Sequence, residues 1–197
     1  MPAIGLIILA AGASARMGEP KQLLTHAGKS LINRALEVGL QSRCTHHVLV
    51  LGANAQSMRS HIGHTAIPIV ENQMWATGLA SSVSTGLKTI VDQNKELDAA
   101  VFMTCDQPFV MSRTINDLID SFIRTYSPIV ACRYSSTIGV PALFAKQLFP
   151  ELFALQGDVG ASAIIKKYAG NVMALDVPEA AVDIDTPDDY NELSVTS

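Results

Sequence analysis

Residues 8–24 read ILAAGASARMGEPKQLL, an apolar run that gives way to small residues and then to two cations, Arg16 and Lys21. The small side chains at positions 10–12 let backbone N–H groups approach a ligand closely, and phosphate is the usual ligand of such a loop. Arg binds phosphate oxygens as a planar fork and Lys binds them as a point charge. The stretch therefore predicts a buried strand followed by a loop that binds a phosphate-bearing ligand.

Strand-like and amphipathic segments alternate along the chain. The expected strands are 4–10, 47–51, 67–70, 99–105, 129–133, 140–144 and 172–177, and the expected helices are 30–41, 55–61, 80–92, one after residue 111, 146–155 and 161–168. With 48% hydrophobic and 16% charged residues, these strands resemble those buried on both faces in parallel sheets. The sequence predicts an α/β fold, a single-domain, doubly wound and mostly parallel sheet, with its ligand crevice at the carboxyl ends of the strands.

The composition excludes several classes of function. A net charge of -4 without a local Lys/Arg cluster offers no cationic surface for a nucleic acid. No stretch approaches the roughly 18 apolar residues of a membrane span, and no positive residue precedes the first apolar run as in a secretory signal. Cys44, Cys105 and Cys132 form no CxxC pair, which favours reduced thiols. We expect a cytoplasmic protein without nucleic-acid or membrane partners.

Two familiar phosphate loops do not fit the opening stretch. Counting from Gly12, Ser14 and Met17 stand where the dinucleotide fingerprint needs glycines. Gly28–Lys29–Ser30 resembles the end of a P-loop, but Leu23 stands at the position of its first glycine. We expect that lysine at the start of a helix instead.

Asp106 is the leading candidate for a metal ligand. It lies in Cys105–Asp106–Gln107–Pro108, directly after an expected buried strand, and an acid at such a strand end can hold Mg2+ over the crevice. Mg2+ requires oxygen ligands and usually keeps water and substrate phosphates as the remainder. The alternative interpretation is an aspartate that starts a turn before a proline.

A second acidic segment follows near position 185. Asp183 and Asp185 are two apart, so on an extended chain both face the same way, and either could complete the metal site. We favour Asp185. Thr186–Asp189 is typical of a helix start, with an N-cap threonine, a proline in the first turn and two acids that complement the helix dipole.

A polar, glycine-broken stretch opens the helix expected at 80–92. It runs from Asn72 to Gly78 and leads into Ala80–Ser81–Ser82, so this helix start can present N–H groups and a hydroxyl to a base or ribose. Trp75 either stacks on a ring or packs against the protein.

The spacing of residues Leu9–Lys21 fits the pattern L-A-A-G-x-S-x-R-M-G-x-x-K. This pattern resembles the signature of the nucleotidyltransferases related to the molybdenum cofactor enzymes, and it is most similar to the molybdenum cofactor cytidylyltransferases. The guanylyltransferase relatives carry A-G-G in place of Ala10–Ala11–Gly12 and an aspartate where this chain has Pro20. The other motifs follow in the expected order up to Leu193. Among them is the family's N-x-x-W-x-x-G, here Asn72–Gly78, whose following serine corresponds to Ser82.

The resemblance implies a Rossmann-like fold of the nucleotide-diphospho-sugar transferase type and a Mg2+-dependent reaction. A phosphate oxygen of a pterin acceptor attacks the α-phosphorus of CTP and pyrophosphate leaves. The resemblance assigns Ala10–Gly12 to base and phosphate, Arg16 and Lys21 to the triphosphate, and Asp106 with Asp185 to Mg2+. It implies a nucleotide-binding part at about 1–110 and an acceptor-binding part at about 111–197.

The segment Gly157–Ala161 matches the family's G-D-x-G-A, on the side where the acceptor is thought to bind. Asp158 is therefore either an acceptor-binding residue or a helix cap. Three other functions stay open. They are a GTP-using enzyme, a sugar-phosphate nucleotidylyltransferase, and a non-catalytic protein that delivers the cofactor to a partner such as a molybdenum hydroxylase apoenzyme.

Overall fold

The first predicted strand, β1 (Ile4–Ala10), lies in the middle of a seven-stranded sheet, and all its residues are buried. The structure is a computed structural model that describes residues 2–195. The other strands of this sheet are β4 (His46–Leu51), β5 (Ile69–Glu71), β6 (Ala99–Thr104), β7 (Ile129–Tyr134), β8 (Thr137–Ala145) and β9 (Val172–Asp176). Their order is β5-β4-β1-β6-β8-β7-β9, and the expected α/β fold is confirmed.

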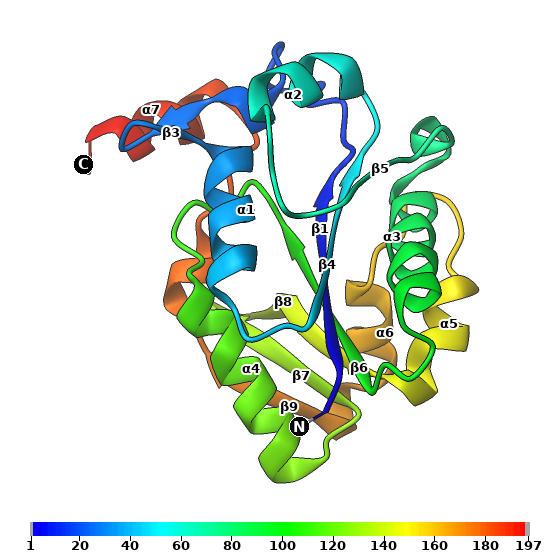
Figure 1. The fold of residues 1–197 in the computed structure, drawn as a ribbon. Helices are drawn as coiled ribbons and strands as arrows, with labels where there is room; N and C mark the ends of the chain where they lie inside the picture. The colour runs from blue at the N-terminus through cyan, green and yellow to red at the C-terminus, as the bar shows by residue number, and fades with distance from the viewer. Residues whose placement is uncertain (1, 196–197) are drawn as a thin grey trace.

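The sheet is mostly parallel, as predicted. Strand β8 is antiparallel to both β6 and β7, whereas the other neighbouring strands pair in parallel. From β1 the chain proceeds to β4 and β5 on one side and then crosses to β6 on the other (Figure 1). The strand order therefore reverses between β1 and β6, and ligands of doubly wound folds bind at this reversal.

Helices cover both faces of the sheet (Figure 1). They are α1 (Leu31–Gln41), α2 (Ala55–Ile62), α3 (Leu79–Gln93), α4 (Ser112–Thr125), α5 (Phe149–Phe153), α6 (Ser162–Lys167) and α7 (Pro187–Val195). Successive side chains of a strand point to opposite faces. Leu6 and Ile8 accordingly join one hydrophobic cluster with α1, α2 and α4, whereas Ile7 and Leu9 join another with α3, α5 and α6.

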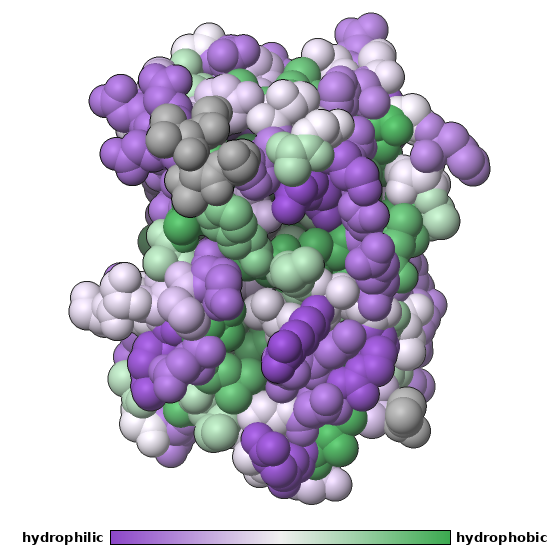
Figure 2. All heavy atoms as spheres, turned by 90° about the vertical axis from the view of Figure 1, so that its left-hand side faces the viewer, coloured by the Kyte–Doolittle hydropathy of each residue, from purple (hydrophilic) through white to green (hydrophobic). Residues whose placement is uncertain are grey.

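Two features bring the helices onto the sheet, buried apolar side chains on one face and glycines on the other. In α4, apolar residues at helical spacing, such as Ile115 and Phe122, are buried. The outward surface on that side of the molecule is largely hydrophilic (Figure 2). On the opposite face, glycines allow α3 to lie close to β1, because a Cβ on Gly86 would collide with Ile7 and one on Gly5 would collide with Ile90.

The structure also differs from the predicted elements. A short hairpin that was not predicted, β2 (Thr25–His26) and β3 (Lys29–Ser30), precedes α1. Lys29 was expected to start the helix but lies in β3, and the N-cap of α1 is Ser30, whose Oγ accepts from the backbone N–H of Asn33. The predicted helix at 146–155 is a 3-10 turn, Lys146–Leu148, followed by α5.

The three cysteines are buried free thiols, as predicted. Burial raises the pKa of the Cys44 thiol to about 11 and that of Cys132 to about 12. Within residues 2–195, none of the helices has the length and apolar character needed to cross a membrane.

Candidate active site

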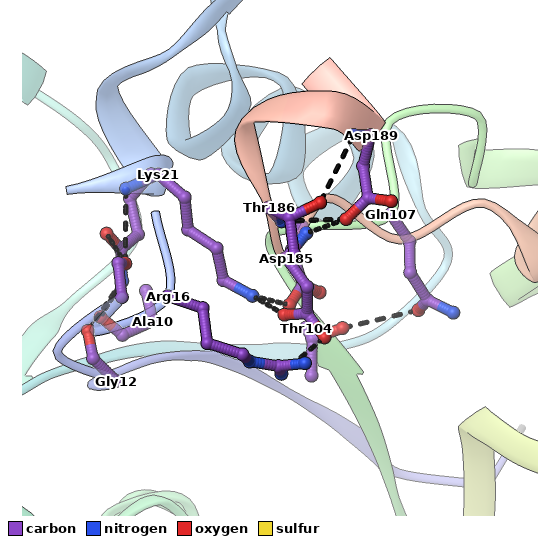
Figure 3. Close-up of polar contacts among 12 residues, drawn as sticks. Ala10, Gly12, Arg16, Lys21, Thr104, Gln107, Asp185, Thr186 and Asp189 are labelled. Carbon is purple, nitrogen blue, oxygen red and sulfur yellow. Dashed lines mark hydrogen bonds and ion pairs between the residues drawn. The ribbon is translucent and has the colours of Figure 1, made fainter. Parts of the chain in front are cut away.

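Lys21 lies between two carboxylates at the switch point of the sheet. Its Nζ is 2.6 Å from Oδ2 of Asp106 and 2.6 Å from Oδ1 of Asp185. Asp106 follows β6. Lys21 begins the 3-10 turn Lys21–Leu23 after the opening loop, and Asp185 precedes α7 (Figure 3). Three segments that are far apart in the sequence therefore meet at one ammonium group.

Arg16 completes the ion pairs around Asp185. One of its terminal guanidinium nitrogens is 2.6 Å from Oδ2 of Asp185, so both oxygens of this carboxylate have a cationic partner (Figure 3). The Arg16 side chain is 70% exposed, compared with 14% for Lys21. Arg16 is thus an exposed cation at the rim, whereas Lys21 is held inside by its two partners.

The charges in this cluster support one another. Burial lowers the pKa of Lys21, but the charge and hydrogen bond of Asp106, followed by those of Asp185, outweigh burial and raise the pKa above its ordinary value. Burial likewise raises the pKa of Asp185, but Lys21 and then Arg16 outweigh it, and the net pKa is lowered. At neutral pH the cluster therefore contains an ammonium and ionised Asp185.

Backbone contacts hold the two acidic segments together. The N–H of Ile184 donates to the carbonyl oxygen of Asp106 at 3.0 Å. The carboxylate of Asp189 accepts from the N–H groups of Asp185 and Thr186, and the Thr186 hydroxyl accepts from the N–H of Asp189. This reciprocal pair is a capping box. It confirms the predicted structural role of Thr186 and Asp189 and fixes the backbone that carries Asp185.

A cavity of about 650 Å3 opens beside this cluster. The opening loop contributes Ala11–Ala13, Arg16 and Lys21 to its wall. The segment at residues 75–79 and Ser82 line another part, and Asp158 also lines it. The structure thus brings together, around one cavity, most of the residues that the sequence singled out.

Two of the predicted binding residues do not reach the cavity wall. Ala10 is the buried last residue of β1. Asn72 is 3% exposed, and its Nδ2 donates to the hydroxyls of Ser81 at 2.8 Å and Ser82 at 2.9 Å. Asn72 therefore fixes the turn that leads into α3.

Gly78 and Asp158 belong to two walls that touch. A Cβ on Gly78 would collide with the backbone of Gly157, and the N–H of Ala80 donates to the carbonyl oxygen of Gly157 at 3.1 Å. Gly78 is thus required for close approach of the backbone. The helix-cap interpretation of Asp158 is wrong, because α6 begins at Ser162 and its N-cap, Ala161, makes no side-chain cap hydrogen bond.

Several cavity residues carried no assigned role in the sequence. These are Ala13, Ala76 and Thr77, which line the wall. Trp75, for which the sequence left stacking on a ring or packing against the protein open, also lines the wall and is 38% exposed. Gly52 was also missed, although a Cβ there would lie 2.6 Å from Cβ of Trp75 and 2.7 Å from the carbonyl oxygen of Ala11. The signal available for Gly52 was a glycine at the end of a buried strand, which often marks close backbone approach.

The donor set at Lys21 fits a divalent cation. Asp106 and Asp185 direct carboxylate oxygens to one point, and Mg2+ accepts two such ligands together with water and phosphate oxygens. Within residues 2–195, no group of three or more His, Cys, Asp or Glu side chains is arranged to hold a metal. Asp183 lines a different cavity, beside Phe109 and Leu193, which supports Asp185 as the second ligand.

Comparison with known proteins identifies the family to which this chain is similar. Residues 6–172 match the family model described as the MobA-like NTP transferase domain. The chain is 31% identical to the nicotine blue oxidoreductase of Paenarthrobacter nicotinovorans, over 94% of both chains. It is 27% identical to the purine catabolism protein PucB of Bacillus subtilis, over 94% of this chain and 93% of that protein. It is 26% identical to the molybdenum cofactor cytidylyltransferase of Escherichia coli, over 96% and 95%.

Solved structures with a similar fold include the protein Rv0371c of Mycobacterium tuberculosis H37Rv. It superimposes with a TM-score of 0.83 at 30% identity and covers 98% of this chain and 97% of that chain. A complex of the same protein with manganese gives a TM-score of 0.80 at 28% identity, over 99% and 100%.

Proposed function

This chain belongs to the MobA-like NTP transferases, a family of nucleotidyltransferases, and we propose that it transfers CMP from CTP to the phosphate of molybdopterin or the molybdenum cofactor. The observation that carries this proposal is the contact of Lys21 with Asp106 and Asp185 beside a cavity walled by the opening loop. The Lys21 ammonium, which can bind a triphosphate, therefore lies within hydrogen-bond distance of the carboxylate oxygens of Asp106 and Asp185, which can bind a metal.

In the proposed reaction, a bond forms between an acceptor phosphate oxygen and the α-phosphorus of CTP, and the bond from that phosphorus to pyrophosphate breaks. Arg16 and Lys21 bind the triphosphate and stabilise the charge that develops on the leaving pyrophosphate. Asp106 and Asp185 hold Mg2+, which when bound neutralises and orients phosphate oxygens. The chain contributes positioning and electrostatics, and phosphoryl-type transfer needs little more from a protein.

The division of the chain into a nucleotide-binding and an acceptor-binding part is also proposed. Residues from about 1–110 contribute the opening loop, the 75–79 segment and Ser82 to the cavity, and these bind CTP. The acceptor-binding part, at about 111–197, contributes Asp158, which contacts the pterin phosphate acceptor across the cavity. A molybdenum hydroxylase apoenzyme is the proposed recipient of the product.

The choice of CTP rests on Ala11. Guanine-using relatives carry glycine at this position, and in this chain Ala11 is buried at the cavity wall, with its carbonyl oxygen bonded to the N–H of Ala53 at 3.1 Å. The relatives do not decide the base, because one is named a molybdenum cofactor cytidylyltransferase and another a probable molybdenum cofactor guanylyltransferase.

The test is pyrophosphate release by the purified protein. CTP, GTP, ATP and UTP are each supplied with Mg2+ or Mn2+, with and without molybdenum cofactor, and the nucleotide product is identified by mass. We expect release with CTP and cofactor together. Lys21→Met and Asp106→Asn should lower kcat/KM by roughly 100-fold or more while the protein stays folded. Lys29→Met is the matched control, because Lys29 pairs with Glu37 at the surface.

Each alternative has its own outcome. Preferred use of GTP would reverse the choice of base, and a requirement for a sugar phosphate would replace the acceptor. Binding of nucleotide or cofactor without release of pyrophosphate would favour a delivery protein. Consumption of NADH or NADPH is measured in parallel because one relative is named an oxidoreductase, and hydride transfer without nucleotidyl transfer would overturn the proposal.

A further inference from the structure

Gln22 is a buried polar residue that neither the motif nor the proposed reaction uses. It is 1% exposed and lies in the 3-10 turn Lys21–Leu23, next to the central lysine. Its Nε2 donates to the carbonyl oxygen of Gly12 at 2.9 Å and to that of Ala10 at 3.4 Å. Burying an amide costs little free energy when its hydrogen bonds are made in this way. If the Gln22 side chain were removed, the carbonyl oxygens of Gly12 and Ala10 would lose these hydrogen bonds and water would not replace them.

The other end of the Gln22 amide is bonded as well. Its Oε1 accepts from the hydroxyl of Ser14 at 3.2 Å, and the same hydroxyl oxygen accepts from the backbone N–H of Lys21 at 3.1 Å. Ser14 has a positive φ of 55°, a conformation that non-glycine residues seldom adopt. Its one proton is given to Gln22, so the oxygen is free to accept from Lys21. A chain of hydrogen bonds thus joins the loop to the start of the lysine turn.

These contacts determine where the carbonyl oxygens of the loop are directed. Gln22 binds those of Ala10 and Gly12, and the N–H of Ala53 binds that of Ala11. All three carbonyl oxygens between the strand and the cavity therefore have donors from the protein. A carbonyl oxygen turned toward the cavity would repel a phosphate, because both carry negative charge.

We propose that Gln22 is a positioning residue that holds the carbonyl oxygens of the opening loop away from the cavity and fixes the backbone of Lys21. Its effect on nucleotide affinity rests on the proposed function, whereas its effect on the loop does not. Glutamine suits this role because one amide supplies both a donor for the carbonyls and an acceptor for Ser14. Glutamate of the same shape would place an acceptor against Gly12.

The first test needs no ligand. Hydrogen exchange is measured over residues 8–24 in wild type, Gln22→Met, Gln22→Glu and Ser14→Ala, with Gln93→Met as the control. Gln93 bonds weakly to His47 at 3.4 Å and lies outside the loop. We expect exchange in the loop to accelerate roughly tenfold in the two Gln22 variants and less in Ser14→Ala, with no change in the control.

The second test measures CTP binding with Mg2+ by the fluorescence of Trp75, the single tryptophan of the chain, which lies in the cavity wall. We expect the Kd of CTP to rise roughly tenfold in both Gln22 variants, and KM to rise more than kcat falls. The effects of Ser14→Ala and Gln22→Met should be non-additive, since the two side chains share one hydrogen bond. A residue that merely supports the fold would change neither the KM-to-kcat split nor this coupling.

The outcomes separate the two proposals. Unchanged loop exchange in both Gln22 variants would overturn the positioning role, whatever the protein does with CTP. Faster loop exchange in the Gln22 variants, together with a wild type that binds no nucleotide, would overturn the proposed function and keep the positioning role. Thermal unfolding is recorded for every variant. If the Gln22 variants do not fold, the Ser14→Ala variant tests the positioning role instead. Loop exchange in Ser14→Ala that is as slow as in wild type would then overturn that role.

Discussion

Lys21 places an ammonium group at the point where two carboxylates converge, and a divalent cation would compete for that point. We therefore expect Lys21→Met to bind Mn2+ more tightly than wild type when no nucleotide is present, by about tenfold, or about 1.4 kcal/mol. Removal of the ammonium leaves Asp106 and Asp185 without their shared partner. Because the two carboxylates then repel each other, a bound cation stabilises the pair. Mn2+ titration followed by electron paramagnetic resonance measures the affinity.

The control for this prediction is the double variant Lys21→Met/Asp106→Asn, which should lose the gain in Mn2+ affinity. The same Lys21→Met protein is expected to be inactive, so metal affinity and activity should move in opposite directions. Equal or weaker Mn2+ binding by Lys21→Met would mean that the lysine and the metal do not share a position.

At the scale of the element, the start of α7 decides where Asp185 lies. Asp189→Ala removes the acceptor for the N–H groups of Asp185 and Thr186, so we expect about 1 kcal/mol lower stability at neutral pH and a loss of activity beyond that. Hydrogen bonds from Thr186 and from the backbone of Asp185 lower the pKa of Asp189 below its ordinary value of 3.8. Denaturant unfolding of both proteins at several pH values measures the difference.

The sign of the pH effect follows from the lowered pKa. A carboxyl group that is more acidic in the folded than in the unfolded protein stabilises the fold above its unfolded pKa, and this stabilisation fades as the pH falls through the folded pKa. The stability difference between wild type and Asp189→Ala should therefore be constant from pH 6 to 8 and shrink below about pH 4. A difference that persists unchanged at low pH would show that the charge of Asp189 is irrelevant.

Elements with strong periodicity were predictable from the sequence. Strand β1 matches its expected bounds, and α4 begins directly after residue 111 as expected, because their apolar residues repeat at the strand and helix periods. The β2–β3 hairpin was missed because its turn places Ala27, a residue with a side chain, at a φ of 50°. Alanine gives no sign of that conformation, which glycine and asparagine usually supply.

The site was predictable where a side chain belongs to a motif and not where tertiary contacts assign the role. The motifs singled out Arg16, Lys21 and Asp106. They left Asp183 and Asp185 as alternatives, with Asp185 favoured, and the structure brings Asp185 together with the other three. The binding role of Asn72 stays a prediction, because a polar residue in such a segment looks the same in sequence whether it faces a ligand or, as here, binds Ser81 and Ser82. Nothing local distinguishes these two cases.

At the scale of the whole molecule, ligands should stabilise the fold, because the cavity and the carboxylate pair need distant parts of the chain. CTP with Mg2+ at about 100 times its Kd should add about 2.7 kcal/mol to the free energy of unfolding, or roughly 5–10 °C in Tm. Thermal unfolding with and without EDTA measures the shift, and the part that needs metal should vanish in Asp106→Asn. A Tm that does not change at any CTP concentration would contradict the presence of a nucleotide site.

The contact between Arg16 and Asp185 joins residues 169 positions apart, and the segment that carries Asp185 is anchored by a small hydrophobic cluster of its own. Ile184 and Leu193 pack there with Met17, Leu24 and Leu31, apart from the two large clusters on the sheet. During refolding, the sheet can form before this cluster packs. Lys21 would then contact Asp106, but Asp185 would not yet lie beside it. Activity would then return later than secondary structure, and mild destabilisation of this cluster would silence the enzyme while most of the protein stays folded.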